Sequence, residues 1–178
     1  MVKEENAIIL DFLSYGYPLE KKMMPLAQAI GIKGFTLLEL VPRRGIKFEV
    51  GENVYIGEDK REKVQYILGR CPREDLTETA KIQLEEFIKK SVEENEEKYV
   101  KFFNEAQAIN TRLHQFELLP GLGKKHTLAI LKARNEKIFD SFEDIKKRVA
   151  NLPSPKNLIE KRIMKELIKM ERHNLFIT

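Results

Sequence analysis

The spacing of the apolar residues changes once along this chain of 178 residues, near Thr77. Before Thr77, short apolar runs alternate with polar residues and are broken by glycine and proline, which is typical of strands. After Thr77, apolar residues recur every three or four positions, which is typical of amphipathic helices. The sequence therefore predicts an α+β protein in two parts, with strands first and helices second.

The strand-like part contains five short apolar runs, at residues 7–13, 35–41, 47–50, 53–56 and 64–68. Glycine or proline follows each run within a few residues. Short strands separated in this way favour a small antiparallel sheet or an OB-like barrel. Between the first two runs, we expect residues 25–31 to form one or two helical turns.

The helix-like part carries an apolar stripe from Ala80 to Leu113. The acidic segment 93–97 interrupts this stripe, which predicts a break between two helices and a solvated acidic face. The apolar residues near the end of the chain are expected to form a strand that returns to the N-terminal sheet. The expected divisions are a β domain at 1–74, a helical connector at 75–110, a helical domain at 111–173 and the strand at 174–178.

Charge is unevenly distributed along the chain, whose net charge is +4. Residues 112–178 carry 15 lysines and arginines against 8 acids, whereas residues 1–111 carry 17 against 20. A basic half attached to a nearly neutral half is typical of a polyanion-binding module.

The composition excludes several classes of protein. No apolar run approaches the ~18–20 residues that cross a bilayer. Glu4 and Glu5 lie where a secretory signal would be basic. Cys71 is the single cysteine and cannot form an internal disulfide, which fits a reducing compartment. We therefore expect a cytoplasmic protein that does not enter a membrane.

A short glycine-containing segment, Leu-Pro-Gly-Leu-Gly at residues 119–123, separates two helical patterns. Its glycines permit a sharp turn, and Leu119 and Leu122 should pack inward. The helix that follows exposes its first backbone N–H groups at the positive end of its dipole, where a phosphate oxygen can bind. Lys124 and Lys125 add ionic attraction at the same place.

This segment resembles the helix-hairpin-helix motif of DNA repair and recombination proteins. The motif is read from Leu119 to Ile130, and Thr127 occupies a position where the family usually has alanine. The resemblance implies contacts to the phosphate backbone by Gly121, Leu122, Gly123, Lys124, Lys125 and Thr127.

A degenerate second copy of the motif follows 33 residues later, at residues 152–156. Tandem motifs of this kind pair about a pseudo-twofold axis and follow both strands of a duplex. Ser154 and Lys156 replace the two glycines, so we expect this copy to be chiefly structural, with Lys156 as a candidate phosphate contact. The final helix carries a basic stripe that includes Lys161 and Lys165, which is either a solvated face or an extension of the phosphate-binding surface.

The N-terminal part offers a second candidate surface, because OB-like barrels bind single strands by stacking and charge. Its candidates are Arg43, Arg44, Lys47, Tyr55 and Tyr66, although tyrosines in strands usually pack and arginines in turns are usually solvated. The arrangement over the full chain resembles an uncharacterised archaeal family that couples an OB-like barrel to tandem helix-hairpin-helix motifs and is described only as nucleic-acid-binding.

Catalytic interpretations find little support. Lys125 with Asp140 or Asp144 resembles the lysine and aspartate of endonuclease III-type glycosylases, but the surrounding motif and cluster-binding cysteines are missing. The three histidines are far apart in sequence, and no Walker-type loop or carboxylate cluster is evident. We expect no enzymatic activity, metal or cofactor.

The sequence thus predicts a protein that binds RNA or DNA without reading bases, in RNA processing, translation or repair. The alternative is a protein–protein adaptor whose hairpins dock on a ribosomal or repair partner. The choices between RNA and DNA and between duplex and single strand stay open, as does the oligomeric state.

Overall fold

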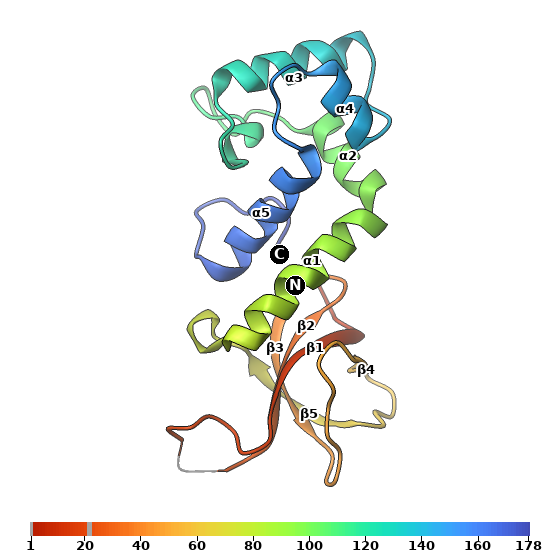
Figure 1. The fold of residues 1–178 in the computed structure, drawn as a ribbon, viewed down its shortest axis with the longest axis vertical. Helices are drawn as coiled ribbons and strands as arrows, with labels where there is room; N and C mark the ends of the chain where they lie inside the picture. Colours follow the sequence, from red (N-terminus) through yellow and green to blue (C-terminus); the bar gives the residue numbers. More distant parts are fainter. Residues whose placement is uncertain (1, 21–22) are drawn as a thin grey trace. The chain divides into compact units, whose positions relative to one another are not determined.

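The computed structural model describes residues 2–20 and 23–178, which form five strands, five α-helices and two short 3-10 helices (Figure 1). The predicted α+β class is confirmed. The chain divides into two compact units, which we call the sheet unit (Met1–Phe87 with Glu166–Thr178) and the helical unit (Ile88–Lys165).

The sheet unit is built on an antiparallel sheet with the strand order β4-β1-β2-β3-β5. Irregularities in the pairing of β1 and β3 bend these strands, and the sheet curls into a half-barrel over an apolar core. Its strands are β1 (Asn6–Leu13), β2 (Leu26–Gly31), β3 (Leu37–Pro42), β4 (Asn53–Tyr55) and β5 (Val64–Arg70).

Two local predictions in the first seventy residues are wrong. Residues 25–31 were expected to be helical, but Leu26–Gly31 form the central strand β2, because pairing with β1 and β3 buries every one of its side chains. Residues 47–50 form no strand. Within them only Phe48 is buried, and it packs edge-to-face on Phe12 with ring centroids 5.8 Å apart.

A buried amide fixes the start of helix α1 (Glu78–Glu94). Gln28, fully buried in β2, donates from Nε2 to the Asp75 carbonyl at 2.6 Å, and its Oε1 accepts from the Thr77 N–H at 3.1 Å. The Thr77 hydroxyl donates to Asp11 at 2.6 Å and accepts from the Ala80 N–H at 3.0 Å, so Thr77 caps α1. The short 3-10 helix η1 (Arg73–Asp75) lies just before this cap.

The end of the chain belongs to the sheet unit but forms no strand, in contrast to the prediction for residues 174–178. The buried carboxylate of Glu166 accepts hydrogen bonds from the backbone N–H groups of Leu175, Phe176 and Ile177, at 2.6, 3.0 and 3.0 Å. These N–H groups are therefore used by a side chain and not by a neighbouring strand.

The helical unit contains the rest of α1 and, in chain order, α2 (Glu96–Glu105), η2 (Gln115–Leu118), α3 (Lys124–Glu136), α4 (Phe142–Arg148) and α5 (Pro155–Ile168). The predicted break lies at Asn95, as the acidic segment suggested. The helical stripe was expected to continue to Leu113, but α2 ends at Glu105, where the Arg134 guanidinium binds the Phe103 and Ala106 carbonyls at 3.2 and 2.8 Å.

Aromatic rings form much of the core of the helical unit. Phe103 and Phe116 are fully buried and stack with centroids 5.8 Å apart. Met170 lies beyond the end of α5 and is 93% exposed. Within the described residues, no helix is both long and apolar enough to cross a membrane.

Replacement of Gln28 by leucine should destabilise the sheet unit. The change keeps a similar volume but removes the partner of the Thr77 N–H and of the Asp75 carbonyl, so we expect a loss of about 1–3 kcal/mol in the free energy of unfolding. Urea unfolding measures this loss. The control Gln65→Leu, on the exposed face of β5, should change the value by no more than about 0.5 kcal/mol; equal losses for both variants would show that Gln28 has no special role.

Candidate nucleic-acid interface

The glycine turn before α3 is exposed, and its conformation is fixed by backbone geometry. Gly121 has φ +79°, a conformation that disfavours other residues, and both Gly121 and Gly123 are exposed. Leu119 and Leu122 are buried, which confirms the prediction that they pack inward, and the Leu122 N–H donates to the Leu119 carbonyl at 3.2 Å. The element before the turn is the single 3-10 turn η2, whereas a longer helix was expected.

Helix α3 begins without a side-chain cap and with a positive first turn. Gly123 is its N-cap, Lys124 and Lys125 are its first residues, and no acid lies in the first turn. The backbone N–H groups of residues 124–126 have no acceptor within the helix, and the first helical bond is donated by Thr127 to Gly123 at 3.1 Å. The positive charges of the two lysines are unfavourable next to the positive end of the helix dipole, so this end of α3 is suited to an anion.

Gly123 is not required by the packing of the chain. Its φ of −120° and ψ of −164° are open to any residue, and a Cβ added there would meet no atom within 4 Å. The glycine therefore leaves free space above the uncapped N–H groups, which allows another molecule to approach the backbone closely.

The two lysines have different surroundings. The Lys124 ammonium donates to the Arg112 carbonyl at 2.7 Å and pairs with Glu117 at 3.3 Å, so it holds the preceding loop. The pKa of Glu117 is lowered first by the hydrogen bond from the His114 N–H and then by Lys124. Lys125 is exposed and has no side-chain partner within residues 2–20 and 23–178, so its charge is available to a ligand.

Sequence reasoning missed the residues that support this turn. His114 caps η2 because its Nδ1 accepts from the Phe116 N–H at 3.1 Å, and the His114 N–H donates to the Glu117 carboxylate at 2.7 Å. Arg162, 1% exposed, donates to the Leu118 carbonyl at 3.1 Å. The spacing of His114 and Glu117, three residues apart, is that of a capping box and could have been found; the partner of Arg162 could not.

Thr127 does not fit its predicted role as a phosphate contact. It is 6% exposed, and its hydroxyl donates to the Gly123 carbonyl at 2.9 Å. Its side chain therefore belongs to the inner face of α3 and positions the turn.

The second copy of the motif is built differently from the first. Helix α5 begins at Pro155, and the Leu158 N–H donates to the Ser154 carbonyl, so Ser154 corresponds to Gly123 with an offset of 31 residues and not 33. The Ser154 hydroxyl accepts from the Asn157 N–H at 3.4 Å. Lys156 pairs with Glu93 and lies 3.7 Å from Glu160. These contacts cap and neutralise the helix start, in keeping with a structural role.

The remaining basic candidates on α5, Lys161 and Lys165, are both exposed. They lie on the outer face of the helix, whereas Ile159 and Ile163 are fully buried. This separation fits either of the two alternatives for the basic stripe.

The sheet unit brings together three of its five candidates. Arg43, Arg44 and Tyr66 line a hollow of about 410 Å³ whose other walls include apolar side chains such as Met24 and Ile46. Tyr66 is 40% exposed, and Arg43 donates to the Arg61 carbonyl at 2.7 Å. Lys47 is exposed and lies outside this hollow.

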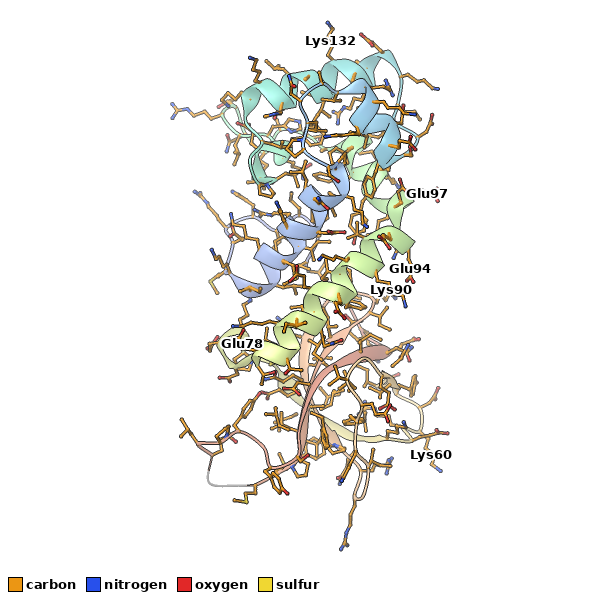
Figure 2. All side chains as sticks on the ribbon, in the orientation of Figure 1. Lys60, Glu78, Lys90, Glu94, Glu97 and Lys132 are labelled. Atoms are coloured by element: carbon orange, nitrogen blue, oxygen red, sulfur yellow. The ribbon has the colours of Figure 1, made fainter. Side chains whose placement is uncertain are left out.

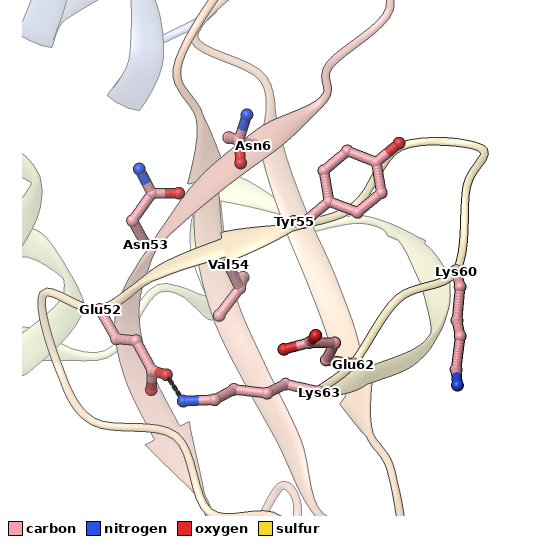
Figure 3. Close-up of a pocket in the computed structure, with 8 residues that line it drawn as sticks. All are labelled: Asn6, Glu52, Asn53, Val54, Tyr55, Lys60, Glu62 and Lys63. Carbon is pink, nitrogen blue, oxygen red and sulfur yellow. Dashed lines mark hydrogen bonds and ion pairs between the residues drawn. The ribbon is translucent and has the colours of Figure 1, made fainter.

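Tyr55 lines a separate hollow beside β4, also of about 410 Å³ (Figure 3). Its hydroxyl accepts from the Asp59 N–H at 3.2 Å. Lys63 is paired with Glu52 in this hollow, and Glu62 adds a second negative charge. Mixed charge makes this place less suited to a polyanion than the hollow at Tyr66.

Comparison with known proteins identifies relatives over nearly the whole chain. Residues 3–178 match the family described as "Protein of unknown function (DUF655)". The chain is 40% identical over 176 residues to "Uncharacterized protein MJ0038" of Methanocaldococcus jannaschii, which covers 98% of this chain and 80% of that protein. It is also similar to the crystal structure of Af1531 from Archaeoglobus fulgidus, with a TM-score of 0.85 and 43% identity. The match covers 98% of this chain and 100% of that chain. The predicted kinship with an uncharacterised archaeal family is confirmed.

The cap on η2 should make stability depend on pH. The pKa of His114 is lowered, first by burial and second by the nearby Arg134 guanidinium. Below the ordinary value of about 6.5, the unfolded chain gains a proton that the folded histidine resists, so the free energy of unfolding should fall as the solution is acidified. Thermal unfolding at about pH 7.5 and at about pH 5.5 measures the change. His114→Asn keeps a capping acceptor without titrating and should reduce the pH dependence; an unchanged dependence would contradict the assignment.

Proposed function

This chain belongs to the DUF655 family, and we propose that it binds RNA or DNA by holding a backbone phosphate at the uncapped start of α3. The observation that carries the proposal is the combination of three features at one place: free backbone N–H groups, an exposed glycine with open space beside it, and Lys125 with an available charge. The same features are what a phosphate oxygen needs at a helix N-terminus.

The contrast between the two helix starts supports this choice of site. In α5 the corresponding position carries the Ser154 hydroxyl, and Lys156 is neutralised by Glu93 and Glu160. In α3 the corresponding position is Gly123, which makes no side-chain cap hydrogen bond in the part of the chain that the structure describes. Because uncapped helix ends are unfavourable, an external anion is a reasonable partner for α3.

The similarity to the helix-hairpin-helix motif supports nucleic acid as the source of the anion. Backbone N–H groups and lysines contact phosphates that every sequence shares, so binding does not read bases. The excess of basic residues in 112–178 adds long-range attraction for a polyanion.

A second contact can come from the curled sheet, which we interpret as an OB-like surface. The hollow at Tyr66 combines an exposed ring with Arg43 and Arg44. An aromatic ring beside arginines suits stacking on an unpaired base with charge on its phosphate. This contact favours single-stranded RNA or DNA, whereas the hairpin alone favours a duplex.

The adaptor alternative is favoured by a different observation. Leu128, on α3, is 68% exposed, and Ile138 just after the helix is 64% exposed. Exposed apolar side chains are typical of protein contacts. The adaptor and the nucleic-acid-binding protein differ in their response to salt.

Filling the helix cap should separate binding from stability. Gly123→Asp places a carboxylate on the free N–H groups, so we expect α3 to be stabilised by about 0.5–1 kcal/mol while nucleic-acid affinity falls at least about tenfold. Unfolding by urea and fluorescence anisotropy with labelled RNA and DNA measure the two effects. The control Gly69→Asp adds the same charge at another open glycine and should keep most of the affinity. Unchanged binding by Gly123→Asp would refute the site.

Salt dependence tests the role of Lys125 and the identity of the partner. Each phosphate contact contributes about one unit to the slope of log affinity against log salt, so Lys125→Gln should reduce the slope by about 1. Lys132→Gln, at an exposed position on the same helix (Figure 2), is the matched control. A parent protein that binds neither RNA nor DNA, or binds with a slope near zero, would favour the adaptor.

A further inference from the structure

A small hollow in the sheet unit contains none of the residues that we assign to nucleic-acid binding. It has a volume of about 260 Å³ and is lined by the β2–β3 connection, the residues after β5 and the end of the chain. Among the described residues that line it, the charged side chains are Arg70 and Arg73, and none is an aspartate or glutamate. The other polar side chains are Thr36, Cys71, Asn174 and Thr178.

Arg73 is the feature that sets this hollow apart. Its Nη1 atom is buried and has no hydrogen-bond partner among the residues that the structure describes. A charged donor that is buried without a partner is unfavourable, because it has lost water and gained nothing in exchange. Arg73 is also one of the residues that line the hollow, and the most suitable acceptor for a guanidinium is an oxyanion.

The walls of the hollow are held in place by contacts behind them. The Cys71 N–H donates to the Leu37 carbonyl at 3.0 Å, which ties the end of β5 to β3. The ring of Phe35 packs edge-to-face on Phe87 with centroids 5.7 Å apart. Glu166 holds the backbone of residues 175–177. A fixed site loses little conformational freedom when a ligand binds.

We propose that this hollow is a binding site for a phosphate group, either inorganic phosphate or the terminal phosphate of a phosphomonoester, held by Arg73 and Arg70. The planar guanidinium matches phosphate oxygens in two-point contacts. The volume is at the lower end for ligand sites, which suits one phosphate with a small attached group. The site does not depend on the start of α3, so the proposal stands apart from the proposed function.

The hollow is a site for binding and not for phosphoryl transfer. Cys71 carries the thiol in the lining of the hollow. Burial raises the pKa of this thiol to about 12, and the negative charge of Glu39 adds to the effect. The group therefore stays a neutral thiol at neutral pH, which is a poor nucleophile.

Titration calorimetry of the full chain with inorganic phosphate tests the proposal, with the melting temperature as a second readout, because a ligand of the folded state raises it by mass action. Parallel titrations with a nucleoside monophosphate and with 5′-phosphorylated and 5′-hydroxyl oligonucleotides distinguish the two sources. Tighter binding of the monophosphate or the phosphorylated oligonucleotide identifies a phosphomonoester; equal or weaker binding identifies inorganic phosphate. No binding of any phosphate up to about 20 mM would overturn the site.

Variants locate the site. Arg73→Gln should weaken phosphate binding at least about tenfold, Arg73→Lys should retain part of it, and Arg172→Gln, an exposed arginine outside the hollow, should leave it unchanged. If Arg73→Gln does not fold, Arg73→Lys by itself tests the site, because loss of the planar guanidinium should still weaken phosphate binding. Lys125→Gln should bind inorganic phosphate like the parent even where it binds nucleic acid less well. Equal binding by both Arg73 variants and the parent would refute the assignment.

Discussion

The sheet unit depends on one buried amide, that of Gln28. A polar side chain in the central strand of a curled sheet is costly unless each of its atoms is paired. Here the pairing partners are the backbone of Asp75 and Thr77, so the cost of burial is offset by fixing where the strands end and α1 begins. Thr77 then caps the helix and joins it to Asp11. The spacing of apolar residues changes from that of strands to that of helices near Thr77, and a hydrogen-bond network fixes the same place in the structure.

The helical unit shows how two similar segments can differ in use. Both α3 and α5 follow a leucine-proline turn, and both accept their first helical bond at the residue before the helix. In α5 that residue is Ser154, and the nearby Lys156 is paired with acids. In α3 it is Gly123, and Lys125 is exposed without a side-chain partner among the described residues. The chain thus completes one helix start by itself and leaves the other to a ligand, which agrees with a division between a structural copy and a binding copy.

The two proposed anion sites use different physics. The start of α3 offers exposed N–H groups and flexible charges, which attract a polyanion over a distance but are screened by salt. The hollow at Arg73 offers a half-buried arginine between fixed walls, which selects one compact group by geometry. A site of the first kind suits contact along a chain of phosphates, and a site of the second kind suits a single phosphate with free oxygens.

Local sequence pattern determined the features that depend on neighbours along the chain. The division into a strand-rich first part and a helical second part, the break at Asn95, and the inward packing of Leu119 and Leu122 all follow from spacing and turn residues. Long-range pairing decided the rest. Residues 26–31 became a strand because β1 and β3 lie on either side of them, and residues 174–178 did not because Glu166 took their N–H groups. The partners of Lys124 and the missing partner of Arg73 are likewise set by atoms distant in sequence, and no one-dimensional pattern reports which atoms the fold brings together.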